Sequence, residues 1–325
     1  MKNRLVKRFI MGLIVLSMIA VTGCSGQDTG SNDQGSQKVE HYSFVSSNPG
    51  GTWYNMVGGA VALFNENIPG VNFSIEATGG SVENTRRVLT GEAEFGFAYS
   101  SHMYEAWNGK GNFEGNTKQT ITALCEVYNS PHYFVTLKGK NIKSMSDLAG
   151  KKVALGAPGS GTSDNSRRVL EALGIEVEGV ELSFADAAQA IQDGRIDALG
   201  QGGAPAAGVV ELAASKDILI IPFNDEELDK IVDLAPYFER GELPANTYEG
   251  QDQPVPTFFF SVYWIAHQDV PEDIVNSVLE TSFSSEGLKY LSDVHPQWKT
   301  LRDNPEGLAL IEIPYHPGAK KYWGK

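Results

Sequence analysis

The sequence has few cysteines, a deficit of basic charge and no apolar run of membrane-spanning length. Only Cys24 and Cys125 occur in 325 residues, which excludes a fold held by several disulfides. Acidic residues outnumber basic ones by 40 to 26, so the net charge of −14 argues against a nucleic-acid partner, which needs a basic face. The apolar run at residues 9–21 is shorter than the roughly 20 residues of a membrane-spanning helix. With 41% hydrophobic residues, the chain is expected to fold into packed domains.

Motifs for catalysis and for cofactor binding are also missing. The six histidines are scattered and form no His-x-His or His-Glu-x-x-His pattern, so no metal site is expected. There is no Gly-x-Ser-x-Gly nucleophile motif, and the glycine-rich residues 156–162 lack the lysine of a phosphate-binding loop. We therefore predict no catalytic residue, no metal and no cofactor.

The amino-terminal segment has the pattern of an export signal. Four basic residues lie within the first eight, the apolar run follows, and Val-Thr-Gly-Cys at residues 21–24 resembles a bacterial lipobox. This pattern predicts a lipoprotein signal peptide over residues 1–23, a lipid on Cys24 and a location on the extracytoplasmic face of the membrane. An ordinary cleavable signal followed by a chance cysteine is the alternative. Residues 25–38 contain no apolar side chain, so residues 24–38 are expected to be a flexible tether.

From residue 39 onward, short β-rich runs alternate with glycine-bearing loops and amphipathic helical stretches. Strands are expected at residues 41–46, 71–77 and 94–99, and the same pattern restarts at residue 152. This alternation predicts an α/β sheet whose ligands bind at the carboxyl ends of the strands. The apolar stretches 122–137 and 256–266 are placed to serve as two hinge crossovers. We expect one lobe from residues 39–126 and 265–325, and a second lobe from residues 127–264.

Three glycine-bearing loops, at residues 48–52, 78–81 and 160–162, immediately precede predicted helices. The first N–H groups of a helix lack partners within the helix and lie at its positive end, so three such loops facing one cleft would bind an anion. The alternative is that Gly, Ser and Thr are simply good N-caps, but three loops at strand ends favour a shared site. Trp53, Tyr54 and Tyr99 adjoin these loops and are expected to line its wall.

Several short segments together resemble a known family. They are GGTWY at residues 50–54, EATGGSVEN at 76–84, GEAEFGF at 91–97, AWNG at 106–109, GSGT at 159–162, GRIDA at 194–198, GGAP at 202–205 and YHPGA at 315–319. In order and spacing, they resemble the substrate-binding subunits of tripartite ATP-independent periplasmic (TRAP) transporters of the TAXI type. The resemblance implies a type II periplasmic-binding-protein clamp, which works as a monomer and hands glutamate, glutamine or a 2-oxo dicarboxylate to an integral-membrane permease.

The resemblance also implies which residues meet the small anionic solute. The expected ligand-binding residues are Gly51, Thr52, Gly80, Ser81, Asn84, Ser160, Gly161, Thr162, Gly203 and Pro205, together with Ser100, which follows the wall residue Tyr99. Where many relatives have Gln-Ser-Asp after the third strand, this chain has Tyr99, Ser100 and Ser101, which removes a carboxylate that could face a ligand ammonium. Asn55 also replaces a common proline. A dicarboxylate without an amine therefore stays open beside an amino acid.

Three alternatives remain for the function. The same clamp serves importers driven by ATP hydrolysis (ABC importers) and receptor kinases, so the chain is also compatible with a binding lipoprotein of either system. An enzyme on this fold is disfavoured because no acid, base or metal constellation is evident in the sequence. A purely structural surface protein is disfavoured by the ligand-type loops.

Overall fold

The computed structural model describes residues 39–49 and 51–325, which form a mixed α/β structure around one ten-stranded sheet. The strands follow the order β2-β1-β3-β10-β4-β7-β5-β6, with β8 paired to β4 and β9 paired to β10. The predicted signal peptide, the lipidation site Cys24 and the predicted tether lie outside the described residues. Within them, no helix has both the length and the apolar character needed to cross a bilayer.

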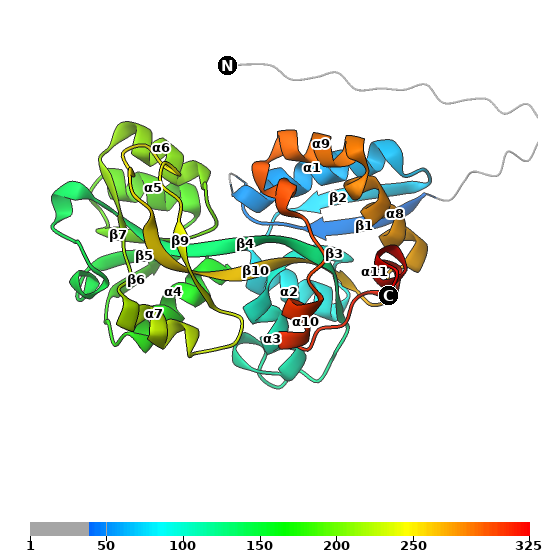
Figure 1. Cartoon of the computed structure of the whole chain (residues 1–325), viewed down its shortest axis with the longest axis horizontal. Coiled ribbons are helices and arrows are strands. Elements are labelled where there is room, and N and C mark those ends of the chain that lie inside the picture. The colour runs from blue at the N-terminus through cyan, green and yellow to red at the C-terminus, as the bar shows by residue number, and fades with distance from the viewer. Residues whose placement is uncertain (1–38, 50) are drawn as a thin grey trace, which may run out of the picture. The chain divides into compact units, whose positions relative to one another are not determined.

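One half of the molecule, the β1–β3 half, begins with three parallel strands and their helices (Figure 1). Helices near the carboxyl terminus return to this half, where α8 and α9 contact α1 and α11 packs on α8. The elements are β1 (Glu40–Val45), α1 (Thr52–Asn67), β2 (Val71–Glu76), α2 (Ser81–Thr90), β3 (Phe95–Tyr99), α3 (Ser100–Asn108), α8 (Glu272–Phe283), α9 (Ser285–Val294), α10 (Pro305–Leu310) and α11 (Pro317–Trp323).

The other half, the β5–β9 half, restarts the alternation of strands and helices. Strand β5 lies parallel to both β6 and β7, so their carboxyl ends share one edge of the sheet. The elements are β5 (Lys152–Gly156), α4 (Gly161–Ala172), β6 (Glu178–Glu181), α5 (Phe184–Gln192), β7 (Ala198–Gly202), α6 (Ala207–Ser215), β8 (Ile218–Ile221), α7 (Asp225–Val232) and β9 (Glu239–Leu243).

Two long antiparallel strands, β4 (Ile121–Leu137) and β10 (Val255–His267), run through both halves (Figure 1). The carboxyl-terminal part of β10 pairs with β3, whereas its beginning pairs with β9; β4 pairs with β7 and β8 over its second part. These are the two stretches predicted to be hinge crossovers. The predicted lobe boundaries fall inside them and stay a prediction.

Aromatic side chains dominate the core of the β1–β3 half. The fully buried ring of Trp264 on β10 stacks on Phe44 and on Phe64, with ring centroids 5.3 and 5.7 Å apart. Cys125, opposite Trp264 in the register of β4 and β10, is buried, and desolvation raises the pKa of its thiol. A second cluster, which includes Tyr133 and Leu199, lies in the β5–β9 half, and the first cluster also extends into that half through residues such as Val169 and Phe223. The sheet is therefore covered by packed side chains in both halves.

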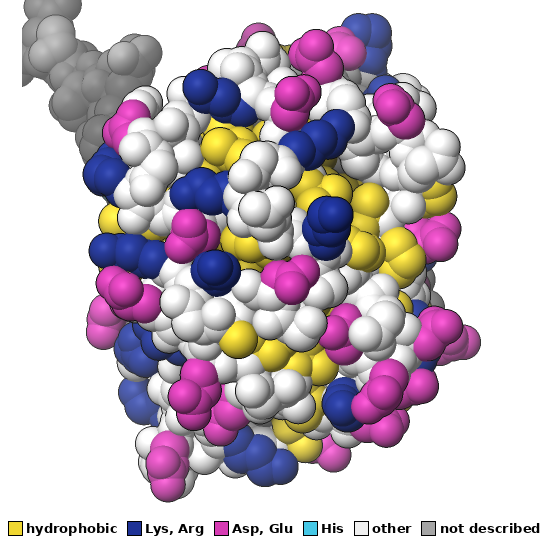
Figure 2. All heavy atoms as spheres, turned by 90° about the vertical axis from the view of Figure 1, so that its left-hand side faces the viewer, with side chains coloured by type: hydrophobic (Ala, Val, Ile, Leu, Met, Phe, Trp, Pro, Cys, Tyr) yellow, Lys and Arg dark blue, Asp and Glu magenta, His cyan; other side chains and the backbone are white. Residues whose placement is uncertain are grey.

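The surface at the end of the β5–β9 half mixes both signs of charge. Figure 2 shows Lys and Arg side chains alternating with Asp and Glu around small apolar areas on this face. Charged side chains of this half also pair locally, such as Lys152 with Glu178 and Arg195 with Asp193. This face has no continuous basic stripe of the kind that would follow a phosphate backbone.

A buried carboxylate joins β4 to the carboxyl-terminal segment. Glu126 is fully buried and accepts hydrogen bonds from Arg302 Nε (2.9 Å), Arg302 Nη2 (3.1 Å) and Asn304 Nδ2 (2.6 Å). Backbone hydrogen bonds between Glu126 and Arg302 add a bridge at the same point. The returning segment is thus fixed directly to one of the two long strands.

We expect Arg302→Met to destabilise the protein, because it leaves the Glu126 carboxylate buried with only Asn304 as a donor. Breaking a buried ion pair costs about 3–5 kcal/mol, and since the Arg302 side chain is 60% exposed we expect about 2 kcal/mol. Urea unfolding measures the change, with the exposed Lys299→Met as the matched control. Equal unfolding midpoints for the two variants would contradict this role of Glu126.

Candidate functional site

A cavity lies where the amino termini of five helices meet. The first residue of each of α1, α2, α4, α5 and α6 lines it; these are Thr52, Ser81, Gly161, Phe184 and Ala207. Two of the helices belong to the β1–β3 half and three to the β5–β9 half. The arrangement follows from the fold, since each helix starts just after a strand and parallel strands end at a common edge.

Three of these helices have no side-chain cap. The N-cap residues of α1, α2 and α6 are Gly51, Gly80 and Ala206, and none accepts a hydrogen bond through a side chain. In contrast, Ser160 caps α4 by accepting from the Ser163 N–H at 3.0 Å. Glycine and alanine N-caps offer no side-chain acceptor to the first-turn N–H groups at the positive ends of these helices. In α1 the Tyr54 N–H donates instead to Ser47 Oγ at 3.2 Å, and in α2 the Glu83 N–H donates to the Gly159 carbonyl. Such ends are ready-made binding positions for an anion.

The wall of the cavity carries no charge. Among the described residues that line it, none is Asp, Glu, Lys, Arg or His. Burial raises the pKa of Tyr99 to about 12 and raises that of Tyr128, so both phenols stay neutral at physiological pH. Trp53 donates from Nε1 to Tyr128 Oη (2.7 Å) and packs edge-on against Tyr99, with ring centroids 5.1 Å apart. Positive polarisation in the cavity therefore comes from backbone dipoles and neutral side-chain donors.

The two halves touch closely around the cavity, so the structure shows the clamp closed. The N–H of Glu83 donates to the carbonyl of Gly159 across the cleft at 3.3 Å. A Cβ on Gly79 would collide with the carbonyl oxygen of Pro158, and a Cβ on Gly161 would collide with the rings of Tyr99 and His102. Glycine at 79 and 161 therefore permits this approach of the two halves.

The structure brings many of the predicted site residues together. Those that line the cavity are Gly51, Thr52, Trp53, Gly80, Ser81, Tyr99, Ser160, Gly161 and Thr162. Tyr54, Asn84, Ser100, Gly203 and Pro205 do not line it; Pro205 borders two neighbouring grooves instead. The loops at 48–52, 78–81 and 160–162 thus meet at one place.

Asn84 has a different role from the one expected. It is fully buried, donates to the carbonyls of Ser46 (2.7 Å) and Phe97 (2.9 Å), and accepts from Thr78 Oγ1 (2.6 Å). All of its hydrogen-bonding atoms are therefore engaged within the protein. We revise its role from solute contact to support of the strand ends that carry the cavity loops.

Sequence reasoning missed nine lining residues, which are Ser47, Gly79, Tyr128, Phe184, Gln201, Gly202, Ala206, Ala207 and Gly208. Gly79 lies within the loop at residues 78–81, and Ser47 lies one residue before the loop at 48–52, so taking every residue of slightly longer loops would have included both. Gln201 and Gly202 end β7, and the general position of ligands at strand ends could have indicated them. Tyr128 lies within a long apolar strand, where no sequence signal distinguishes it from core.

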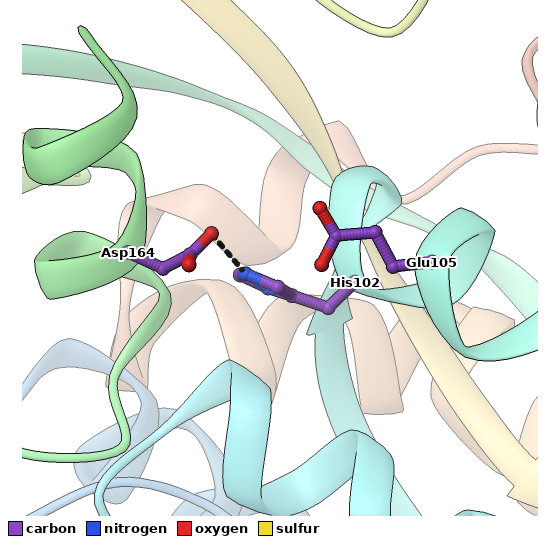
Figure 3. Close-up of side chains that lie close together, drawn as sticks. All are labelled: His102, Glu105 and Asp164. Atoms are coloured by element: carbon purple, nitrogen blue, oxygen red, sulfur yellow. Dashed lines mark hydrogen bonds and ion pairs between the residues drawn. The ribbon is translucent and has the colours of Figure 1, made fainter. Parts of the chain in front are cut away.

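A second group of polar side chains lies beside the cavity. Ligand atoms of His102, Glu105 and Asp164 come within 4.8 Å of one another, and Figure 3 shows the histidine of α3 facing the aspartate of α4. Arg168 pairs with both carboxylates. Since a guanidinium already compensates these carboxylates, the group has the character of an ion-pair cluster and does not favour a cation site. The sequence did not predict this meeting of a histidine with acidic groups.

Comparison with known proteins agrees with this architecture. The model of the NMT1-like family matches residues 45–324. An ancestral arginine-binding protein is 14% identical with a TM-score of 0.51, over 80% of this chain and 99% of that chain. A Bordetella bronchiseptica RB50 protein is 17% identical with a TM-score of 0.51, over 89% of each chain. A putative L-cystine ABC transporter from Listeria monocytogenes is 14% identical with a TM-score of 0.49, over 80% of this chain and 96% of that chain.

The two-part sheet, the two connecting strands and the cavity between helix termini define a type II periplasmic-binding-protein fold, which confirms the predicted α/β clamp. At identities below 20%, the similar structures support the fold alone. The family match covers most of the chain, and the protein belongs to the NMT1-like family, of the periplasmic solute-binding class.

We expect Asn84→Ala to lower the free energy of unfolding, because it removes the buried amide that donates to the carbonyls of Ser46 and Phe97 and accepts from Thr78. The hydrogen bond of Thr78 Oγ1 to the Ser46 carbonyl (3.1 Å) remains and limits the loss. Unsatisfied buried groups cost about 1–3 kcal/mol each, and partial relaxation should limit the total to about 3 kcal/mol. Thermal or urea unfolding measures it, with Asn108→Ala, a half-buried helix-terminal asparagine, as the control. A loss no larger than that of the control would return Asn84 to the list of candidate solute contacts.

Proposed function

We propose that the protein is an extracytoplasmic solute-binding lipoprotein that captures a small organic anion and delivers it to a membrane permease. The observation that supports this most directly is the meeting of five helix amino termini, from both halves, on a cavity whose described lining residues include no charged side chain. A clamp of this kind closes because the solute gains contacts with the second half only in the closed form.

The uncharged wall also narrows the solute class. Backbone N–H groups and hydroxyls favour carboxylate or other anionic oxygens, whereas a ligand ammonium is normally met by a carboxylate. Ser101 stands where the resemblance implies such a carboxylate, and no acidic residue lines the cavity in the described part of the chain. Within the class of glutamate, glutamine and 2-oxo dicarboxylates, this favours a 2-oxo dicarboxylate.

The delivery partner is inferred from the resemblance to the TAXI-type subunits of TRAP transporters. On this proposal the protein hands its solute to an ion-driven integral-membrane permease, and a lipid on Cys24 holds it at the extracytoplasmic face. An ABC importer is the alternative, since the same clamp serves both kinds of transporter; one similar structure is described as an arginine-binding protein bound to arginine. Arginine would need acidic side chains that the cavity wall lacks.

An enzyme is the weaker alternative. Ser81 contacts His102, and His102 contacts Asp164, which is the order of residue types in the catalytic triad of serine hydrolases. The histidine is reversed, however, since Ser81 meets Nδ1 and Asp164 meets Nε2, and Ser81 Oγ already accepts the N–H of Tyr99 at 2.8 Å. We infer a binding role, and hydrolysis of p-nitrophenyl acetate that is lost in Ser81→Ala would favour the enzyme instead.

Isothermal titration calorimetry with matched pairs of solutes tests the proposal. We expect 2-oxoglutarate to bind more tightly than L-glutamate or L-glutamine, and arginine to give no heat, because the wall offers donors but no carboxylate. Thr162→Ala should weaken binding of 2-oxoglutarate by about 1 kcal/mol, roughly fivefold, through loss of one donor. Thr90→Ala, exposed and remote from the cavity, serves as the control. Absence of binding to every organic anion tested would overturn the proposal.

Closure is tested by a glycine substitution. Gly161→Ala introduces a good helix former in the first turn of α4, so the helix itself should not be weakened. The added methyl group would collide with Tyr99 and His102 only when the two halves are together. We expect at least tenfold weaker binding of 2-oxoglutarate with an unchanged melting temperature, and X-ray scattering that stays open on titration. Gly58→Ala, whose Cβ would meet nothing within 4 Å, is the matched control. Undiminished affinity in Gly161→Ala would show that binding does not require this closure.

A further inference from the structure

A group of polar side chains beside the cavity links the two halves directly. Asp164, on α4 of the β5–β9 half, accepts from His102 Nε2 of α3 at 3.1 Å and from Asn112 Nδ2 at 2.8 Å. Arg168, one turn further along α4, pairs with Glu105 of α3. Every one of these three contacts joins residues at least 52 positions apart in the sequence. They join α3 and the short turn Gly111–Phe113 of one half to α4 of the other. Figure 3 shows His102 and Glu105 of α3 beside Asp164 of α4.

The cluster is shielded from water, which strengthens its interactions. His102 and Glu105 are buried, and the side chains of Asp164 and Arg168 are only 22% and 25% exposed. Burial raises the pKa of Asp164, but the hydrogen bond and charge of His102 and the charge of Arg168 outweigh it and hold that pKa well below its usual range. Arg168 also donates to Tyr237 Oη at 3.0 Å, which fixes its side chain within its own half. Charge-assisted contacts of this kind are stronger than those at an open surface.

The cluster is also joined to the cavity. Ser81 lines the cavity, and its Oγ lies 2.8 Å from His102 Nδ1. The opposite ring nitrogen of His102 faces the Asp164 carboxylate, which accepts, so Nε2 bears the proton. One imidazole thus bridges a residue of the solute wall to a residue of the opposite half. His102 has no direct access to the cavity and would act through Ser81.

We propose that His102, Glu105 and Asn112 of one half and Asp164 and Arg168 of the other form a latch that stabilises the closed clamp before any solute is bound. His102 is its positioning residue and connects the latch to the solute wall at Ser81. This proposal rests on the proposed solute-binding function. The latch lowers the free energy that the solute must supply for closure, because part of the closed-state interaction is already present in the protein itself.

Double electron–electron resonance on the full chain without solute tests the latch. Spin labels on Glu66→Cys of α1 and Gln189→Cys of α5, both exposed positions, report the separation of the halves. The substitution Cys24→Ser prevents labelling at that position, and Cys125 is buried, so the labels attach at the two introduced cysteines. In the protein with an intact latch, we expect a fraction of the molecules to show the short label-to-label distance of the closed form. We expect Arg168→Gln to reduce this fraction at least threefold. Arg167→Gln is the matched control, because its neighbouring guanidinium pairs with Glu181 inside the same half.

Each outcome decides the proposal. The latch is supported if Arg168→Gln loses the closed population while Arg167→Gln keeps it, and if Asn112→Ala, an exposed position whose replacement should leave the fold intact, causes a smaller loss. It is overturned if the solute-free protein has no closed population, or if Arg168→Gln and Asn112→Ala both retain it. Calorimetry of the same samples with 2-oxoglutarate tests the proposed function independently. Absence of binding there would count against the proposed function, whereas the latch is tested by the distance measurements alone.

Discussion

The unpaired N–H groups at the starts of helices are the constraint on which the site depends. A helix leaves its first-turn donors without internal partners, and here α1 and α2 start after residues that offer no side-chain acceptor. Their positive ends meet those of three helices from the other half at a wall without charge. Among the described residues that line the cavity no carboxylate repels an anion, so these dipoles act on it unopposed. The geometry thus favours an anionic solute through the backbone.

The sheet provides the second constraint. Parallel strands in each half end at a common edge, so the helices that follow them begin there. The long strands β4 and β10 pair with each other along the centre and reach both halves. Because Tyr128 lies on β4 and lines the cavity, the connection between the halves also contributes to the solute wall. Contacts such as that of Glu83 with Gly159 and that of His102 with Asp164 then depend on how the halves meet.

Local sequence signals were sufficient for much of the fold. A helix was expected directly after the loop at residues 78–81, and α2 covers Ser81–Thr90; residues 122–137 were expected to form one connected crossover, and β4 covers Ile121–Leu137. The loops around Thr52, Ser81 and Gly161 were recognised because glycine and hydroxyl residues precede amphipathic stretches. Asn84 shows the limit of this reasoning. The resemblance to the TAXI-type subunits implied a solute contact for this residue, whereas packing directs its amide to Ser46 and Phe97.

The sequence by itself determined the α/β alternation, the positions of the glycine loops and the acidic, cysteine-poor composition, because these depend on residues close together in the chain. Only the tertiary structure decided which side chains share the cavity and which meet across it. Tyr128 has no local signal that separates it from core, and Asp164 meets a histidine 62 residues away only when α3 and α4 come together. Long-range contacts of this kind depend on the arrangement of whole elements, which short patterns do not encode.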